Sequence, residues 1–380
     1  MQVLAAIAGL AILCAVLWDS FETIILPRRV TRGFRITRAY YRYAWLSWRA
    51  MTRRLREGRV RQALLSYFGP LSLLALFAIW VGALIVSFGL LHWAAGSAIN
   101  TQGGAPSIGS DFYLSGTTFF TLGIGDVTPR SGVARLITVI ESGTGFGILA
   151  IVISYLPVIY SAFSKREVNI SLLDARAGSP PSAGELLRRH APPERAGALI
   201  EYLRDWEEWS AELMESHLSY PALCFFRSQH SNQSWIAGLT TILDASAFLV
   251  AYARGTLQWQ AQLTFAIARH AVVDLAVVVT APPLPLAVER LPPDSRDSLR
   301  KSLAAEGLEL RGAECDGDLA ELRHSYESYL NGLSRRFLMP LPLWAPARAT
   351  ADNWQRSAWD SAGMRTGKRQ SLRRALRSDD

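Results

Sequence analysis

Three long apolar stretches lie in the first 164 residues of the chain. They cover approximately residues 3–26, 68–93 and 133–163. An α-helix rises about 1.5 Å per residue, so each stretch is long enough to cross a bilayer core of about 30 Å. The pattern predicts three membrane-spanning helices, with a shorter and more polar segment between the second and the third.

The first stretch carries two acidic residues near its end. Asp19 and Glu22 lie three positions apart and would share one helical face, where solvation at the membrane interface is the favoured interpretation and contact with protein neighbours the alternative. A cleaved signal peptide is the rival interpretation of the stretch. The sequence has neither a basic amino-terminal region nor a clear small-x-small cleavage site before Asp19, so we expect a retained span.

The distribution of basic residues predicts the orientation. Residues 28–61 contain twelve Arg and one acidic residue, and Lys165 and Arg166 follow the third stretch, whereas residues 94–109 contain no Lys or Arg. Positively charged loops tend to stay on the cytoplasmic side of a membrane. We therefore expect a multi-pass plasma membrane protein whose amino terminus lies outside and whose C-terminal domain lies in the cytoplasm.

Aromatic residues are interleaved with arginines in residues 28–61. The aromatic residues are Tyr40, Tyr41, Tyr43, Trp45 and Trp48, and the neighbouring arginines are Arg38, Arg42 and Arg49. This mixture is typical of a helix that lies among lipid headgroups, and it predicts contact with anionic lipid. Nucleic acid is not an expected partner, because membrane spans flank the segment on both sides.

The net charge of +8 belongs to the apolar part of the chain. Residues 1–164 carry 14 Arg and 6 acidic residues, whereas residues 165–380 carry 26 basic and 26 acidic residues. Membrane orientation and anionic lipid explain such an excess. The three cysteines, Cys14, Cys224 and Cys315, are too far apart to suggest a disulfide framework or a paired metal motif, which suits a reducing compartment.

From Lys165 onward, apolar residues recur mostly at helical spacing, and Pro-rich breaks separate the segments. We expect an all-α membrane protein in five parts. These are an N-terminal span at 1–27, a basic cytoplasmic or interfacial linker at 28–66, a pore module at 67–164, a helical cytoplasmic domain at 165–362 and a basic disordered tail at 363–380. Residues 365–377 of this tail are expected to touch anionic lipid.

Two segments of the C-terminal domain, residues 235–253 and 263–280, are apolar enough to raise the question of additional spans. Asp244 in the first, and Arg269 and Asp274 in the second, would each cost about 2.5–3.5 kcal/mol at the middle of a bilayer. Buried helices of a soluble domain are therefore the favoured interpretation.

A metal or hydrolytic site in this domain is a further alternative. Its residues would be His217, His230, His270 and Asp274. The sequence, however, has no paired-His or paired-Cys motif, singles out no nucleophile, and lacks a P-loop or a strand followed by Gly-x-Gly-x-x-Gly. We expect neither an enzyme nor a resident cofactor.

The polar segment at residues 111–129 is too short to cross the membrane, but it can enter and return. Its first ten residues suffice for about two and a half helical turns, whose C-terminal dipole end would stabilise a cation. Alternating glycines then permit the dihedral angles that turn successive carbonyl oxygens toward one axis. The expected selectivity filter consists of Thr121, Leu122, Gly123, Ile124, Gly125 and Asp126.

This arrangement resembles the pore family of potassium channels, in which a pore helix leads into Thr-x-Gly-x-Gly-Asp between two spanning helices. The resemblance covers about residues 68–163. It implies passive potassium conduction through a homotetramer, with the permeating K⁺ held by Thr121, Leu122, Gly123 and Ile124. The family usually carries Tyr or Phe where this chain has Ile124, so the aromatic side chain that braces the filter is absent.

Other residues near the filter are candidates for support and gating. Thr117, Thr118 and Glu141 are expected to support the pore, with Glu141 behind the filter rather than in contact with the ion. Gly143, Gly145 and Gly147 match the inner-helix stretch at which the family bends. A gating hinge and close helix packing are equally compatible with these three glycines.

Two other functions stay open at this point. A potassium transporter-type subunit would use similar filter loops, although such chains carry four loops and this chain carries one. A ligand sensor with a non-selective cation pore would place ligand binding in the helical domain. No span carries a regular ladder of arginines, so we expect no voltage sensor.

Overall fold

The computed structural model describes residues 1–26, 35–101, 105–230, 232–285 and 288–345. Most of these residues are helical, and their only strands form one two-stranded sheet. Within these ranges, five helical segments are long and apolar enough to cross a membrane: Gln2–Ile25, Arg59–Ala94 (α3), Gly132–Ala177 (α5), Trp235–Tyr252 (α8) and Gly255–Val278 (α9). The predicted class, an all-α membrane protein, is confirmed.

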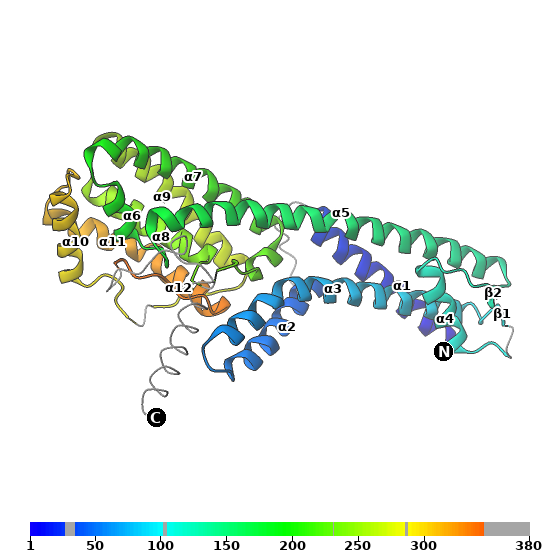
Figure 1. The fold of residues 1–380 in the computed structure, drawn as a ribbon. Coiled ribbons are helices and arrows are strands. Elements are labelled where there is room, and N and C mark those ends of the chain that lie inside the picture. The colour runs from blue at the N-terminus through cyan, green and yellow to red at the C-terminus, as the bar shows by residue number, and fades with distance from the viewer. Residues whose placement is uncertain (27–34, 102–104, 231, 286–287, 346–380) are drawn as a thin grey trace, which may run out of the picture. The chain divides into compact units, whose positions relative to one another are not determined.

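The described chain packs as two compact units (Figure 1). The first unit contains residues 1–163 and 216–227, and the second contains the rest of the described chain. The sequence predicts residues 216–227 as part of the helical cytoplasmic domain, whereas in the structure they pack with the first unit. Two helices, α5 and α7 (Ala196–Ser219), supply residues to both units.

The first unit is built on long helices that lie side by side (Figure 1). In chain order its elements are α1 (Gln2–Ser20), the π-helix η1 (Phe21–Ile25), α2 (Ile36–Arg53), α3, β1 (Ile99–Thr101), α4 (Ile108–Phe119), β2 (Val127–Pro129), the first part of α5 and the 3₁₀ helix η3 (Pro221–Phe225). The short helix α4 and both strands lie at one end of this unit, and α2 lies at the other. Trp80 and Leu84 of α3, Val16 of α1 and Tyr155 of α5 belong to its apolar core.

The acidic residues at the end of the first span are buried, contrary to the favoured expectation of interfacial solvation. Asp19 accepts hydrogen bonds from the Thr37 backbone N–H at 3.1 Å, the Thr37 hydroxyl at 2.6 Å and the Trp80 indole N–H at 3.1 Å. Glu22 accepts a hydrogen bond from the Trp18 indole and pairs with Arg35 at 3.3 Å. The carboxylates therefore join α1 and η1 to the beginning of α2 and to α3.

We expect Asp19→Asn to lower the free energy of unfolding by about 1–3 kcal/mol, because an amide NH₂ group would face donors that now meet carboxylate oxygens. Thermal unfolding of the detergent-solubilised protein measures the change. Glu57→Gln is the matched control, because the Glu57 side chain is 90% exposed. Equal stability of the two variants would contradict a structural role for Asp19.

Most aromatic residues of α2 pack onto the first unit itself, which differs from the expected row of headgroup anchors. Trp45 is buried, and its ring packs edge-on against Phe68 of α3 and Phe225 of η3. The Trp48 indole donates a hydrogen bond to the Leu64 carbonyl at 3.1 Å. Tyr43, by contrast, is exposed. The aromatic face of α2 therefore fixes the helix to the protein.

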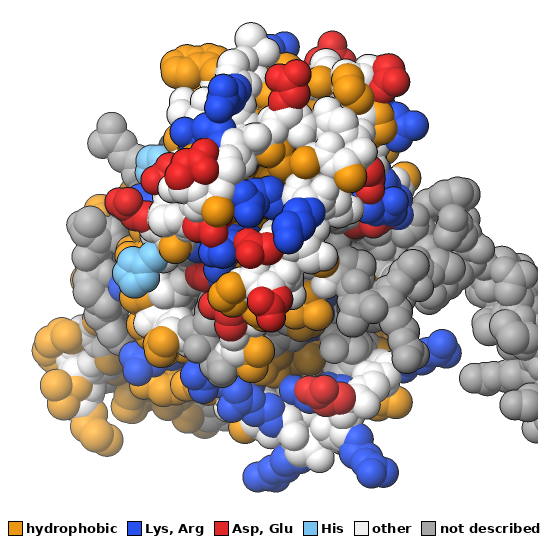
Figure 2. Space-filling model, turned by 90° about the vertical axis from the view of Figure 1, so that its left-hand side faces the viewer, with side chains coloured by type: hydrophobic (Ala, Val, Ile, Leu, Met, Phe, Trp, Pro, Cys, Tyr) orange, Lys and Arg blue, Asp and Glu red, His pale blue; other side chains and the backbone are white. Residues whose placement is uncertain are grey.

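The second unit is a helical bundle around α8. Besides the end of α5 and all but the last turn of α7, its elements are α6 (Ala183–His190), η2 (Pro193–Arg195), α8, α9, α10 (Pro293–Ala305), η4 (Ala313–Cys315), α11 (Asp316–His324) and α12 (Glu327–Phe337). Every residue of α8 except Val250 is buried. Figure 2 shows basic and acidic side chains intermixed on one face of the molecule.

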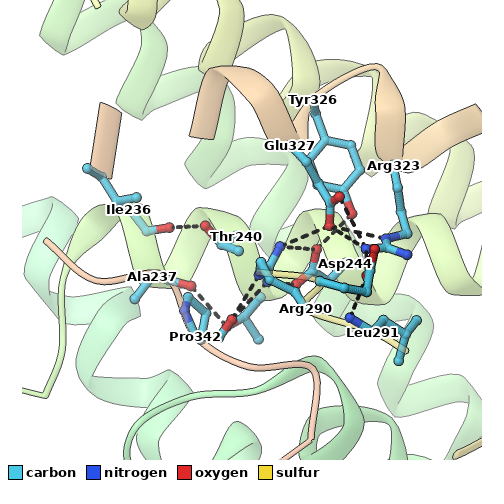
Figure 3. Close-up of polar contacts among 12 residues, drawn as sticks. Ile236, Ala237, Thr240, Asp244, Arg290, Leu291, Arg323, Tyr326, Glu327 and Pro342 are labelled. Atoms are coloured by element: carbon cyan, nitrogen blue, oxygen red, sulfur yellow. Dashed lines mark hydrogen bonds and ion pairs between the residues drawn. The ribbon is translucent and has the colours of Figure 1, made fainter. Parts of the chain in front are cut away.

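The carboxylate of Asp244, which lies within α8, is neutralised by a network of buried side chains (Figure 3). Arg290 pairs with Asp244 through two guanidinium nitrogens and with Glu327 at 3.3 Å. The Tyr326 hydroxyl donates to Asp244 at 2.7 Å, and Arg290 also donates to the Pro342 carbonyl at 3.1 Å. Burial alone would lower the pKa of the Arg290 guanidinium, but these carboxylates raise it above its ordinary value.

The residues of the alternative metal or hydrolytic site are distributed over both units. His270 lies 3.4 Å from Asp274 on α9, whereas His217 belongs to the first unit and His230 to the second. Within the described ranges there is no group of three or more His, Cys, Asp or Glu side chains that could hold a metal ion.

Candidate ion-conducting pore

The pore helix α4 begins earlier than the sequence suggested. Its N-cap is Ser107, whose hydroxyl accepts a hydrogen bond from the Ser110 backbone N–H at 3.2 Å. The helix therefore begins at Ile108 rather than at residue 111. Asp111 lies in the first turn, is fully buried, and accepts a hydrogen bond from the Ser97 hydroxyl. This bond connects the start of α4 to the loop after α3.

The end of α4 passes into the candidate filter through backbone hydrogen bonds. The Leu122 N–H donates to the Thr117 carbonyl at 2.8 Å, and the Thr121 N–H donates to the Thr118 carbonyl at 2.9 Å. The Thr117 hydroxyl donates to the Leu114 carbonyl at 3.0 Å, within α4 itself. In this arrangement Thr117 and Thr118 hold the first filter residues with their carbonyl oxygens rather than with their side chains.

Left-handed residues alternate with others along the candidate filter. Thr121, Gly123 and Gly125 have φ angles of +56°, +54° and +86°, and Leu122 and Ile124 between them are not among the positive-φ residues. Alternation of this kind turns successive peptide groups, and glycine adopts the left-handed region without strain. The Leu122 and Ile124 side chains are each 62% exposed in the single chain.

Short strands and a tyrosine flank the outer end of the candidate filter. Asp126 accepts a hydrogen bond from the Val127 backbone at 3.0 Å, and β2, which starts at Val127, pairs antiparallel with β1. The Tyr113 hydroxyl of α4 lies close enough to the Asp126 carboxylate to interact with it. The segment after the filter is thus held both by the sheet and by the pore helix.

We expect Tyr113→Phe to weaken the hold on Asp126, because a phenyl ring cannot donate to the carboxylate. The carboxylate would then keep only its hydrogen bond from the Val127 backbone N–H. The ratio of K⁺ to Na⁺ flux in liposomes measures the effect, and we expect it to fall. Tyr160→Phe on α5 is the control, since Tyr160 is exposed. An unchanged ratio in Tyr113→Phe would contradict the bracing role.

Glu141 lies behind α4, where it meets two other elements. Its carboxyl group contacts the Ser115 hydroxyl of α4, and its Oε2 atom lies 3.5 Å from Nε2 of His92 at the end of α3. Ser115 also donates to the Ile85 carbonyl at 2.8 Å. All three side chains, His92, Ser115 and Glu141, are buried. Glu141 therefore contacts the pore helix at Ser115, before the filter begins at Thr121.

The three glycines of α5 occupy different surroundings within an unbroken helix. A Cβ atom at Gly145 would lie 2.4 Å from the Phe119 carbonyl oxygen at the end of α4. At Gly143 and Gly147 a Cβ would meet nothing within 4 Å. Gly145 thus permits α5 to approach the pore helix, which favours the packing interpretation at this position.

Three residues of the site were missed by the sequence interpretation: His92, Ser115 and Tyr113. In the sequence, His92 is a single polar residue at the end of an apolar span. Ser115 is a single small residue of an amphipathic helix. Helical periodicity places Tyr113 on α4 but gives no distance to Asp126. Their partners lie far away in sequence or across a turn, so no local pattern signals them.

Comparison with known proteins addresses the same segment. Residues 73–161, which run from α3 through α4 and the candidate filter to α5, match the profile of a family described as "Ion channel". These residues are similar to the pore module of an ion channel. The resemblance inferred from the motif is thereby confirmed for this part of the chain.

One curated relative is also a membrane protein. The Bacillus subtilis (strain 168) protein named "Uncharacterized membrane protein YdjJ" is 30% identical over 193 residues, which make up 50% of this chain and 54% of the relative. The chain therefore matches about half the length of this relative. No solved structure matches the chain.

Proposed function

We propose that the chain is one subunit of a passive, potassium-selective channel. The observation that carries the proposal is the alternation of left-handed residues at Thr121, Gly123 and Gly125 directly after a short helix within an ion-channel pore module. A backbone of this kind can present successive carbonyl oxygens to a dehydrated cation. The filter carbonyls of residues 121–124 are the proposed K⁺ ligands.

A homotetramer completes the proposed pore. One chain contributes one filter segment, and a carbonyl ring needs several copies around an axis. The filter side chains Leu122 and Ile124 are exposed in the single chain, as are Phe146 and Ile153 of α5. Four copies around a common axis would cover such apolar surfaces and bring the filter segments together.

The proposed topology has the amino terminus outside and the second unit in the cytoplasm. The amino terminus lies at the same end of the first unit as α4 and both strands (Figure 1). In the second unit, α8 is buried inside the protein, and α7 carries exposed charged residues such as Arg204, Asp205 and Glu208. These features suit a water-soluble domain better than two further spans.

The exposed face of α2 suits anionic lipid headgroups. It carries arginines beside apolar side chains: Arg38, Arg42, Arg53, Arg54, Tyr43, Leu46 and Met51. Basic residues attract anionic lipid at about 1 kcal/mol each near the surface. Residues 28–34 of the proposed lipid-binding segment, and the tail at 365–377, lie outside the described residues.

Control of gating by the second unit is part of the proposal. The helix α5 is continuous from the pore module to its final residues, which belong to the second unit. A ligand that changes the second unit therefore has a covalent, helical connection to the pore module. A transporter-type subunit is less well supported, since one filter segment per chain is present.

Flux from liposomes tests the proposed function. We expect purified protein to release K⁺ much faster than Na⁺. Gly123→Ala should abolish this preference, because a left-handed L-residue costs about 1–2 kcal/mol and the change occurs in every subunit. Gly132→Ala is the matched control, since Gly132 has no positive φ and open space around it. Equal K⁺ and Na⁺ release by the unmodified protein would instead favour a non-selective cation pore.

A further inference from the structure

Three titratable side chains from three elements meet behind the pore helix. His92 lies in the last turn of α3, Asp111 in the first turn of α4 and Glu141 in α5, and their exposed fractions are 1%, 0% and 0%. Both ring nitrogens of His92, Oδ1 of Asp111 and Oε2 of Glu141 have no hydrogen-bond partner. Buried polar atoms are normally satisfied, so this cluster requires an explanation.

The two contacts of the Ser115 hydroxyl group indicate where one proton lies. The Ser115 oxygen contacts both the Ile85 carbonyl, at 2.8 Å, and Oε1 of Glu141. A hydroxyl group carries one hydrogen, and the Ile85 carbonyl carries none. If Ser115 donates to Ile85, the hydrogen in the contact between Ser115 and Glu141 must come from a protonated Glu141.

The charges around the cluster support the same assignment. Asp111 lies at the positive end of α4, where its carboxyl group accepts the hydrogen of the Ser97 hydroxyl. The polar side chains that face Glu141 are His92 and Ser115, and the Ser97 hydroxyl faces Asp111. A neutral Glu141 adds no charge to the buried cluster, whereas its carboxylate would place a further negative charge in the protein interior.

We propose that His92, Asp111 and Glu141 form a buried proton-binding site that holds Glu141 as the neutral acid. The site fixes α4 at two positions, Asp111 and Ser115, and the same helix supports the filter through Thr117 and Thr118. When Glu141 loses its proton, its carboxylate and the Ile85 carbonyl compete for one hydroxyl hydrogen. The hold on α4 then weakens, and conduction falls at alkaline pH on the filter side of the membrane.

Infrared difference spectroscopy of the full-length protein tests the proton directly. We expect the carbonyl band of a protonated carboxylic acid at neutral pH, lost in Glu141→Gln and retained in Glu57→Gln, whose side chain is exposed. In Ser115→Ala the band should shift rather than vanish, because the acid loses its acceptor. A band that persists unchanged in Glu141→Gln, or no band at all, would overturn the assignment.

The effect on conduction rests on the proposed function and has its own measurement. As the pH is raised above neutral we expect K⁺ flux to fall about tenfold, the factor that corresponds to one unsatisfied buried group. Glu141→Gln should remove this dependence, since an amide donates to Ser115 at every pH. An unaltered pH dependence in Glu141→Gln would refute the link to conduction. If the protein conducts no ions, the infrared result still decides the proton site.

Discussion

Replacing Gly145 with alanine is expected to abolish conduction and tetramer formation. The added Cβ would lie 2.4 Å from the Phe119 carbonyl oxygen and 3.2 Å from the Phe119 Cα, and both are backbone atoms that no side-chain rotation can move. Overpacking typically costs about 1–3 kcal/mol, and here each subunit adds its own contribution. Because Phe119 ends the pore helix, relief of the clash would displace the residues that carry the filter.

The neighbouring glycines supply the controls for this prediction. Gly143→Ala and Gly147→Ala meet open space, so they should form tetramers and conduct, with a helix stabilised by up to about 1 kcal/mol at each position. Size-exclusion chromatography and liposome flux report assembly and conduction. Normal assembly of Gly145→Ala would contradict the packing role, and a gating change in all three variants would favour a hinge.

Removing the buried guanidinium of Arg290 is expected to destabilise the second unit strongly. Arg290→Met would leave Asp244 buried inside α8 without its cationic partner. Breaking a buried ion pair by removing one partner costs about 3–5 kcal/mol. Denaturation of the full-length protein, followed by the fluorescence of buried tryptophans such as Trp235, should show a correspondingly less stable transition.

Two further variants separate the ion pair from general effects of the substitution. Arg335→Met removes an exposed arginine of α12 and should change stability by less than about 0.5 kcal/mol. Adding Asp244→Leu to Arg290→Met should restore part of the lost stability, because the unpaired carboxylate is then absent. If Arg290→Met costs no more than Arg335→Met, the network of Figure 3 does not stabilise the unit.

The spans and the pore helix could be predicted because they depend on local periodicity and length. The limits of the helices could not: α3 begins at Arg59 rather than near residue 68, and α5 continues to Ala177. Helices extend beyond the bilayer when polar residues follow the apolar stretch, and hydropathy marks only the apolar part. The filter motif was readable because glycine is needed where φ is positive.

The contacts of Asp19 and of η3 could not be predicted from the sequence. Asp19 meets Thr37 and Trp80, which lie far away along the chain, and a hydropathy pattern treats its carboxylate as a solvated group. The return of residues 216–227 to the first unit depends on η3, where Phe225 packs against Tyr41 and Trp45. Such pairings are set by three-dimensional packing rather than by spacing.

The reversal potential of a planar bilayer that contains the purified protein tests the central claim most directly. With unequal K⁺ on the two sides and Na⁺ making up the difference, a filter built on residues 121–124 predicts a reversal potential that follows the K⁺ gradient, by about 59 mV for each tenfold step. A reversal potential at zero, or one that follows the Na⁺ gradient, would contradict potassium selectivity by these carbonyl oxygens.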